Sequence, residues 1–216
     1  MSENVNYQLK LDKILSGIEQ QELVPSLLLH SCCAPCSSYV LEYLSRYFRI
    51  TIYYYNPNIS EETEYRKRVE EQKRLIRELP VGYPVSFLEG AYDPAEYARA
   101  VEGMEHLGER SKRCYACYEL RLSSTAKRAK ELCADYFTTT LSISPHKNAV
   151  WLNEIGERVS RDYDIPYLYA DFKKRGGYKR SIELSATYHL YRQDYCGCSF
   201  SKAERQAQVC GNMHQQ

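Results

Sequence analysis

The segment Ser26-Leu27-Leu28-Leu29-His30-Ser31-Cys32-Cys33-Ala34-Pro35-Cys36 joins a short apolar run to three closely spaced cysteines. An apolar run of this length predicts a buried strand over residues 26–30. Residues 37–47 read as a helix, and residues 49–55, rich in β-branched and aromatic side chains, read as a second strand. The segment therefore predicts a strand, a cysteine-bearing turn, a helix and a second strand.

The same alternation continues along the chain. Further strands are expected at residues 84–88, 136–142 and 165–169, and helices at 8–22, after 60, after 94, after 114 and around 151–159. A final helix is expected to carry Ile182 and Leu190 and to end near Cys196. Alternating strands and helices predict an α/β fold with a parallel sheet flanked by helices, in which ligands bind at the carboxyl ends of the strands.

Length and composition predict one domain over residues 1–216, with an N-terminal helical extension to about residue 24 and a polar tail from about residue 206. The formal net charge of +1 gives no global attraction to nucleic acid or membranes. We expect a cytoplasmic protein with no membrane partner, since neither a signal peptide nor a long apolar span is visible. In such a reducing compartment the nine cysteines indicate metal binding or redox catalysis rather than a disulfide scaffold.

Two cysteine groups carry the chemistry. The first is in the opening segment and the second is Cys114-Tyr115-Ala116-Cys117, which begins a helix. A structural zinc is one interpretation, with a four-thiolate set of Cys33, Cys36, Cys114 and Cys117. The long separation of the two groups and the fifth thiol, Cys32, favour an iron–sulfur cluster over zinc, and a thiol–disulfide couple is the third alternative.

A further pair, Cys196-Gly197-Cys198, has the C-x-C spacing. Such a pair can form a labile, redox-active disulfide, or it can be two half-buried small residues. The sequence leaves these alternatives open. Cys133 lies on the apolar stripe of its predicted helix and is expected in the core.

The chain resembles the QueH-type epoxyqueuosine reductases. The resemblance is carried in order by residues 28–37, 54–59, 113–122, 137–148 and 191–198, so it covers the chain from about Leu28 to Phe200. It implies a Rossmann-like, PP-loop (HUP)-like fold without an ATP-binding loop. It also implies reduction of the epoxide of epoxyqueuosine, at the wobble position of a tRNA, to the alkene of queuosine, with electrons from a donor that the sequence does not identify.

The resemblance also implies the cofactors. A [4Fe–4S] cluster is carried over to Cys32, Cys33, Cys114 and Cys117, with a mononuclear metal, iron or zinc, beside it. Some members of the family have Asp where this chain has Cys36, so Cys36 is assigned to the mononuclear metal. There the metal could act as a Lewis acid on the epoxide oxygen.

Several other residues are candidates for substrate binding. Asn56 and Asn58 follow a strand, where a turn alone also explains them, and Tyr65 and Tyr178 could stack on an extruded base. The basic stretch 173–181 contains Arg175, Arg180 and Ser181 and could contact phosphates, and Arg192 precedes the C-x-C pair. Arg66 and Arg68 are expected to be solvated. Cys36, Cys196 and Cys198 are the candidate catalytic residues.

Two other functions compete with the reductase. A zinc-stabilised RNA-binding module without catalysis would contain zinc and no iron. A thiol–disulfide oxidoreductase using Cys196 and Cys198 would need no cluster.

Overall fold

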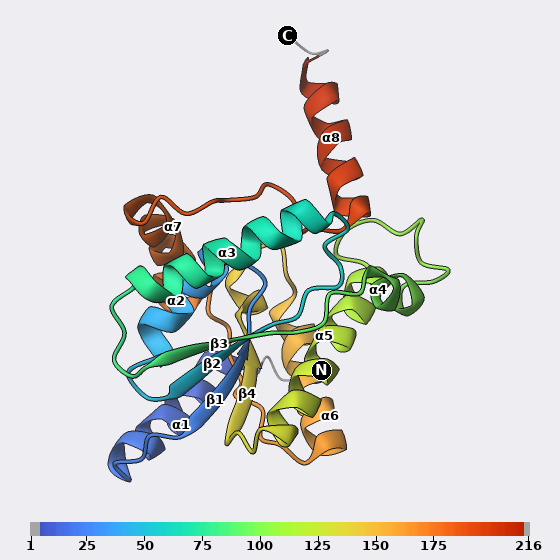
Figure 1. The fold of residues 1–216 in the computed structure, drawn as a ribbon. Coiled ribbons are helices and arrows are strands. Elements are labelled where there is room, and N and C mark those ends of the chain that lie inside the picture. The colour runs from blue at the N-terminus through green and yellow to red at the C-terminus, as the bar shows by residue number, and fades with distance from the viewer. Residues whose placement is uncertain (1–4, 214–216) are drawn as a thin grey trace.

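The computed structural model describes residues 5–213, with side chains as far as Cys210, and it shows a parallel sheet between two layers of helices (Figure 1). The strands are β1 (Ser26–His30), β2 (Arg49–Tyr54), β3 (Val85–Glu89) and β4 (Tyr136–Thr139). Their order across the sheet is β3-β2-β1-β4, and every neighbouring pair is parallel. The predicted α/β fold is confirmed, and the arrangement is consistent with a Rossmann-like description.

The helices begin at residues that favour helix starts. Asp93 caps α4 by accepting from the Ala95 N–H, and Asn148 caps α6 by accepting from the Val150 and Trp151 N–H groups. The α-helices are α1 (Tyr7–Gln20), α2 (Ala34–Leu44), α3 (Glu62–Glu78), α4 (Pro94–Ala100), α5 (Lys112–Glu131), α6 (Ala149–Tyr163), α7 (Gly177–Thr187) and α8 (Ser199–Met213). Two short 3₁₀ helices are η1 (Thr140–Ile143) and η2 (Lys174–Gly176).

Side chains that alternate along the strands build a core on each face of the sheet. Leu27 and Leu29 of β1 pack with residues of α1, α2 and α3 on one face. Leu28 packs with residues of α5 and α6 on the other face. This alternation is the period of two that a strand imposes, and it buries β1 on both sides. The carboxyl end of β1 is thereby fixed between two helical layers.

The structure corrects the expected fifth strand. Residues 165–169 form only an isolated bridge between Phe137 and Tyr167, with a backbone hydrogen bond on each side of it. Pro166 has no N–H to donate, so a ladder of hydrogen bonds cannot extend through this segment.

The C-terminal part of the chain also differs from expectation. The helix expected to end near Cys196 ends at Thr187, and an irregular segment leads to α8. α8 continues to Met213, through the segment predicted as a polar tail from about residue 206, and projects away from the sheet (Figure 1). Cys133, expected in the core, is exposed in the turn after α5. Within residues 5–213, none of the helices has the length and apolar character needed to cross a bilayer.

Candidate functional site

Three thiols meet where β1 ends. The strand stops at His30, and α2 begins at Ala34 with Cys33 as its extended N-cap residue. The sulfur atoms of Cys32, Cys33 and Cys36 all lie within 4.8 Å of one another. Among the described residues, this is the one group of three or more metal-ligating side chains that come so close. The turn therefore presents three thiol ligands together.

Hydrogen bonds among these thiols move their pKa values apart. Bonds from Cys32 and Cys36 hold the pKa of Cys33 well below its ordinary value. Hydrogen bonding with Cys32 and Cys33, together with burial, raises the pKa of Cys36 well above its ordinary value. The group thus favours a thiolate at Cys33, and the thiolate is the form that binds metals.

A second pair of thiols lies at the start of α5. Ser111 caps this helix by accepting from the Arg113 N–H, and Cys114 and Cys117 follow in its first turns. The Cys114 sulfur accepts from the backbone N–H of Arg110 at 3.3 Å. Cys117 is buried, and burial raises the pKa of its thiol to about 11. These two cysteines are not part of the close group at the end of β1.

The buried guanidinium of Arg121 lies near both groups of cysteines. Arg121 is 1% exposed and donates to Asn56 Oδ1 at 2.7 Å and to His30 Nε2 at 3.3 Å. Its Nη1 is 3.8 Å from the Cys117 sulfur, and Arg121 lines the same cavity as Cys32. No carboxylate of the described residues forms an ion pair with it. A buried charge without a counter-charge is costly, so the site is suited to a group that brings negative charge.

His30 supports this guanidinium. The His30 Nε2 atom lies 3.3 Å from the Nε atom of Arg121 and 3.1 Å from the carbonyl oxygen of Tyr55, and its Nδ1 atom lies 2.8 Å from Thr139 Oγ1. Burial, with the nearby charge of Arg121, lowers the pKa of His30 to about 3. His30 is therefore a neutral, hydrogen-bonded residue of the interior.

An open cavity of about 680 Å³, which we call the cysteine cavity, lies beside the β1–α2 turn and Arg121; Cys114 and Cys117 are not among its lining residues. It is bounded by the β1–α2 turn, the α4–α5 loop, the η1–α6 loop, the segment between α7 and α8, and the first half of α8. Its volume is that of a site for a small molecule or cofactor. The residues predicted from sequence that line it are Cys32, Cys33, Cys36, Tyr178, Ser181, Arg192 and Cys196.

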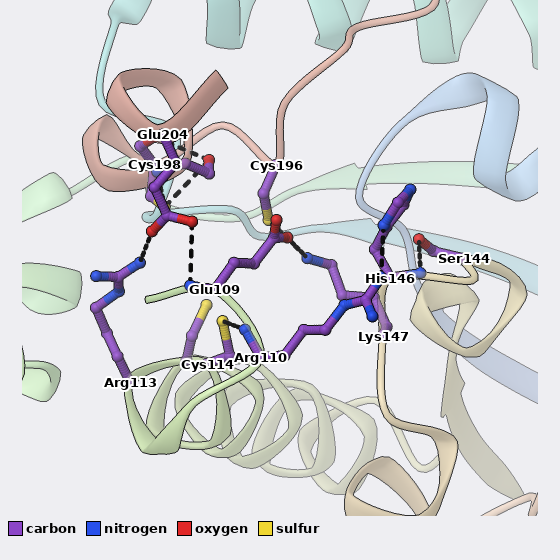
Figure 2. Close-up of polar contacts among 12 residues, drawn as sticks. Glu109, Arg110, Arg113, Cys114, Ser144, His146, Lys147, Cys196, Cys198 and Glu204 are labelled. Atoms are coloured by element: carbon purple, nitrogen blue, oxygen red, sulfur yellow. Dashed lines mark hydrogen bonds and ion pairs between the residues drawn. The ribbon is translucent and has the colours of Figure 1, made fainter. Parts of the chain in front are cut away.

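The two cysteines of the C-x-C pair have different surroundings. Cys196 lines the cavity, and its sulfur is 3.2 Å from the Nζ atom of Lys147, which lies 3.0 Å from Glu109 Oε1 (Figure 2). Cys198 is buried, and its sulfur accepts from the Ser201 N–H at 3.4 Å. Both cysteines are free thiols. One thiol thus faces the cavity beside a cation, and the other is covered.

Three residues expected to bind substrate do not line the cysteine cavity. Asn56 is buried, and its amide bonds to the backbone of the β1–α2 turn and to Arg121. Asn58 is buried beside a second cavity of about 200 Å³. Tyr65 is fully buried in the core, with its ring stacked on Tyr92 at 4.2 Å between centroids. Turn formation and core packing account for all three.

The basic stretch before α7 does not supply cations to the cavity. Arg175 pairs with Asp12, and Arg180 pairs with Glu42 at 2.6 Å. Neither arginine lines the cysteine cavity. The phosphate contact expected for these two residues stays a prediction, and in the structure both connect α7 and its preceding turn to neighbouring helices.

Arg68, expected to be solvated, is buried. It pairs with Glu64 at 2.7 Å within α3 and donates to the Cys196 carbonyl oxygen at 3.2 Å. The charge of Arg68 is thus compensated inside the protein, and its side chain ties α3 to the C-x-C segment.

Two central cations of the site, Arg121 and Lys147, are not among the catalytic, substrate-binding or metal-binding residues predicted from the sequence. Arg121 follows Cys117 by four residues, a spacing that places both on one face of a helix. That signal was visible in the sequence. For Lys147 the local signal was its position after a predicted strand. Its contacts with Glu109 and Cys196 could not be predicted, because they join segments that are distant in the sequence.

Comparison with known proteins gives the family. Residues 27–204 match the family model described as "Epoxyqueuosine reductase QueH". The chain belongs to the QueH family. It is 42% identical over 202 residues to the epoxyqueuosine reductase QueH of Streptococcus pyogenes serotype M1, covering 93% of this chain and 79% of that protein. With the QueH of Staphylococcus aureus strain Mu50 it shares 40% identity over 208 residues, covering 94% and 87%.

A more distant QueH protein, from Thermotoga maritima, is 34% identical over 186 residues, covering 83% of this chain and 92% of its own. Because QueH proteins are named as reductases, this member is an enzyme of the oxidoreductase class. The family resemblance seen in the sequence is confirmed.

Proposed function

We propose that the protein reduces the epoxide of epoxyqueuosine in a cytoplasmic tRNA to the alkene of queuosine. The carrying observation is that cysteines of the QueH match open on one cavity beside a buried guanidinium that lacks a counter-charge. The names of the relatives supply the substrate. The reaction takes up two electrons and two protons, breaks both carbon–oxygen bonds of the epoxide, and releases water.

The residues present are compatible with a [4Fe–4S] cluster on Cys32, Cys33, Cys114 and Cys117 and with a mononuclear metal, iron or zinc, at Cys36. Thiolates are the usual ligands of such clusters, and three of these five thiols are already adjacent. The uncompensated charge of Arg121 supports an anionic group at this place. When bound, the cluster would supply electrons, and the second metal would be a Lewis acid for the epoxide oxygen.

The protein's own residues would hold the modified nucleotide. The cavity volume suits a single extruded base with its ring substituent rather than a stacked duplex. Tyr178 is half-buried on the cavity wall, where its ring could stack on the base. Ser181 and Arg192 line the same wall and would supply hydrogen bonds.

The C-x-C pair would take part in the electron supply. When Cys196 and Cys198 join in a disulfide, their thiols release two electrons and two protons, the number that one epoxide consumes. An external two-electron donor would then reduce the disulfide again. Cys196 is the thiol that an incoming donor would meet, because it faces the cavity and Cys198 is covered.

The test begins with iron and sulfide analysis of anaerobically purified protein, followed by turnover of tRNA that carries epoxyqueuosine. We expect about four to five irons and about four sulfides per chain. Cys117→Ser should lose the cluster and the activity. Cys133→Ser, a matched loss of an exposed thiol remote from the cavity, should lose neither.

Two results would overturn the proposal. One zinc per chain, without sulfide and without turnover after reconstitution, would favour the RNA-binding module. A cluster-free protein that reduces disulfides but not epoxyqueuosine would favour the thiol–disulfide oxidoreductase.

A further inference from the structure

Arg110 lies at the edge of the cysteine cavity and also contacts Cys114. Its φ angle is +67°, in the left-handed region that residues with side chains rarely adopt. In this conformation its backbone N–H donates to the Cys114 sulfur, and its side chain points away to His146, where Nη2 and Nδ1 are 2.9 Å apart (Figure 2). The strained backbone thus places a guanidinium at the cavity edge next to an imidazole.

The hydrogen bond fixes what His146 can offer. Because Arg110 can only donate, Nδ1 of His146 must accept, and the neutral ring carries its proton on Nε2. Both side chains are exposed, and both line the cavity. The pair therefore presents a fixed positive charge and a set of N–H donors, with no acceptor of its own left over. Such a donor set suits an oxyanion such as a phosphate.

The other cations of the cavity already have partners. Lys147 pairs with Glu109 at 3.0 Å, and Arg205 pairs with Asp194 at 3.2 Å. Arg121 is buried below the rim.

At the rim itself, Arg110 and Arg192 have no carboxylate partner among the described residues. Arg110 bonds to His146 and Arg192 to the Ser185 hydroxyl. Unpaired, exposed positive charge at the rim therefore lies on these two arginines. The Ser185 hydroxyl beside Arg192 is buried and donates to the Ser181 carbonyl oxygen, whereas His146 beside Arg110 is exposed and has an N–H to offer a ligand.

We propose that Arg110 and His146 bind a phosphate of the RNA strand next to the modified nucleotide. This inference rests on the proposed function. A cavity of about 680 Å³ holds one base and its substituent, so the adjoining backbone has to cross the rim. Arg110 lies at that crossing, and the hydrogen bond to His146 holds its guanidinium in place before the strand arrives.

The test measures binding of tRNA carrying epoxyqueuosine to the full-length, metal-loaded protein over a series of salt concentrations. Arg110→Ala should weaken binding about tenfold at 0.1 M salt and should lower the slope of log K against log salt by about 0.7, the contribution of one phosphate in a single strand. His146→Ala should weaken binding by about threefold. Iron and sulfide should stay unchanged in Arg110→Ala, because the bond to Cys114 comes from the backbone.

Lys112→Ala is the matched control. Lys112 is exposed, lies two residues from Arg110 and does not line the cavity. Its removal takes away the same charge and should change affinity less than twofold. Arg110→Lys keeps the charge without the planar fork and should retain the salt slope with intermediate affinity. If Arg110→Ala loses iron, the test of the phosphate site is instead the comparison of tRNA affinity and salt slope between Arg110→Lys and Lys112→Ala.

The outcomes separate this inference from the proposed function. If the wild-type protein turns over the tRNA and Arg110→Ala keeps the wild-type affinity and slope, the phosphate site is wrong and the reductase stands. An equal loss in Lys112→Ala would also refute the site, because it would show a diffuse surface charge. A wild-type protein that neither binds nor reduces the tRNA would overturn the proposed function itself.

Discussion

Replacing Arg121 by methionine should lower the free energy of unfolding of the metal-loaded protein much more than that of the metal-free protein. Arg121 is almost fully buried, and its described neighbours are neutral side chains and thiols rather than carboxylates. Methionine is close to arginine in length and apolar bulk, so the change removes the charge and the donors without opening a large cavity. The consequence then depends on whether the nearby sulfur atoms carry charge.

The magnitude follows from the contact with Cys117. A charged sulfur 3.8 Å from the Arg121 Nη1 gains about 4 kcal/mol at an effective dielectric constant of about 20. A neutral thiol gains none of this. In the metal-free protein, losing the bonds to Asn56 and His30 costs about 1–3 kcal/mol each. Removing the buried, unpaired charge stabilises the metal-free protein by several kcal/mol, so this gain and the loss of the hydrogen bonds nearly cancel.

The assay is anaerobic urea unfolding of Arg121→Met, measured with and without reconstitution by iron and sulfide. Circular dichroism monitors unfolding in both forms, and the visible absorption of the cluster monitors it in the reconstituted form. Arg128→Met on the same helix is the control. Arg128 is exposed and paired with Glu131, so its loss should cost less than about 1 kcal/mol in either form. An equal loss of stability for Arg121→Met in both forms would refute the assignment of Arg121 as a counter-charge.

Three further predictions concern the framework of the site, and urea unfolding measures each. Asp135→Asn should cost about 1 kcal/mol at pH 7, because Ser26 donates two hydrogen bonds that lower the Asp135 pKa. The stability they add is present above the ordinary Asp pKa and is lost as the pH falls through the lowered pKa of Asp135, so the difference between wild type and variant should disappear in acid. Gly156→Ala should cost about 1–3 kcal/mol, because its Cβ would lie 2.4 Å from the Tyr167 ring, and an unchanged midpoint would contradict this packing. Gly17→Ala, in α1 with nothing within 4 Å, should instead add about 0.5–1 kcal/mol, and a loss would show that the site is crowded.

The sheet could be predicted because its strands are short apolar runs between helical patterns. The exception, residues 165–169, has the apolar composition of a strand, but Pro166, its second residue, cannot donate a hydrogen bond to a neighbouring strand. The proline alone argues against a regular strand over this segment. The length of α8 could not be judged from polarity alone, since an exposed helix needs no apolar stripe where it leaves the body of the protein.

The cysteine groups could be predicted because spacing and strand ends are local features of the sequence. Substrate contacts were harder, because they depend on which way a side chain turns. Tyr65 is on the apolar stripe of α3 with Val69, and this position already indicated burial. The partners of Arg175 and Arg180 lie far away in the sequence, so no local pattern could show that carboxylates already neutralise them.

The buried charges distinguish the two sides of the cysteine cavity. On the C-x-C side, Lys147 and Arg68 touch Cys196, and each has a carboxylate partner. That side is electrically balanced with neutral thiols. On the other side, Arg121 touches Cys117 and has no carboxylate among its described contacts. Metal-bound thiolates would balance it, so the charge distribution favours a metal centre at Cys117 and the β1–α2 turn, and leaves the C-x-C pair free for thiol chemistry.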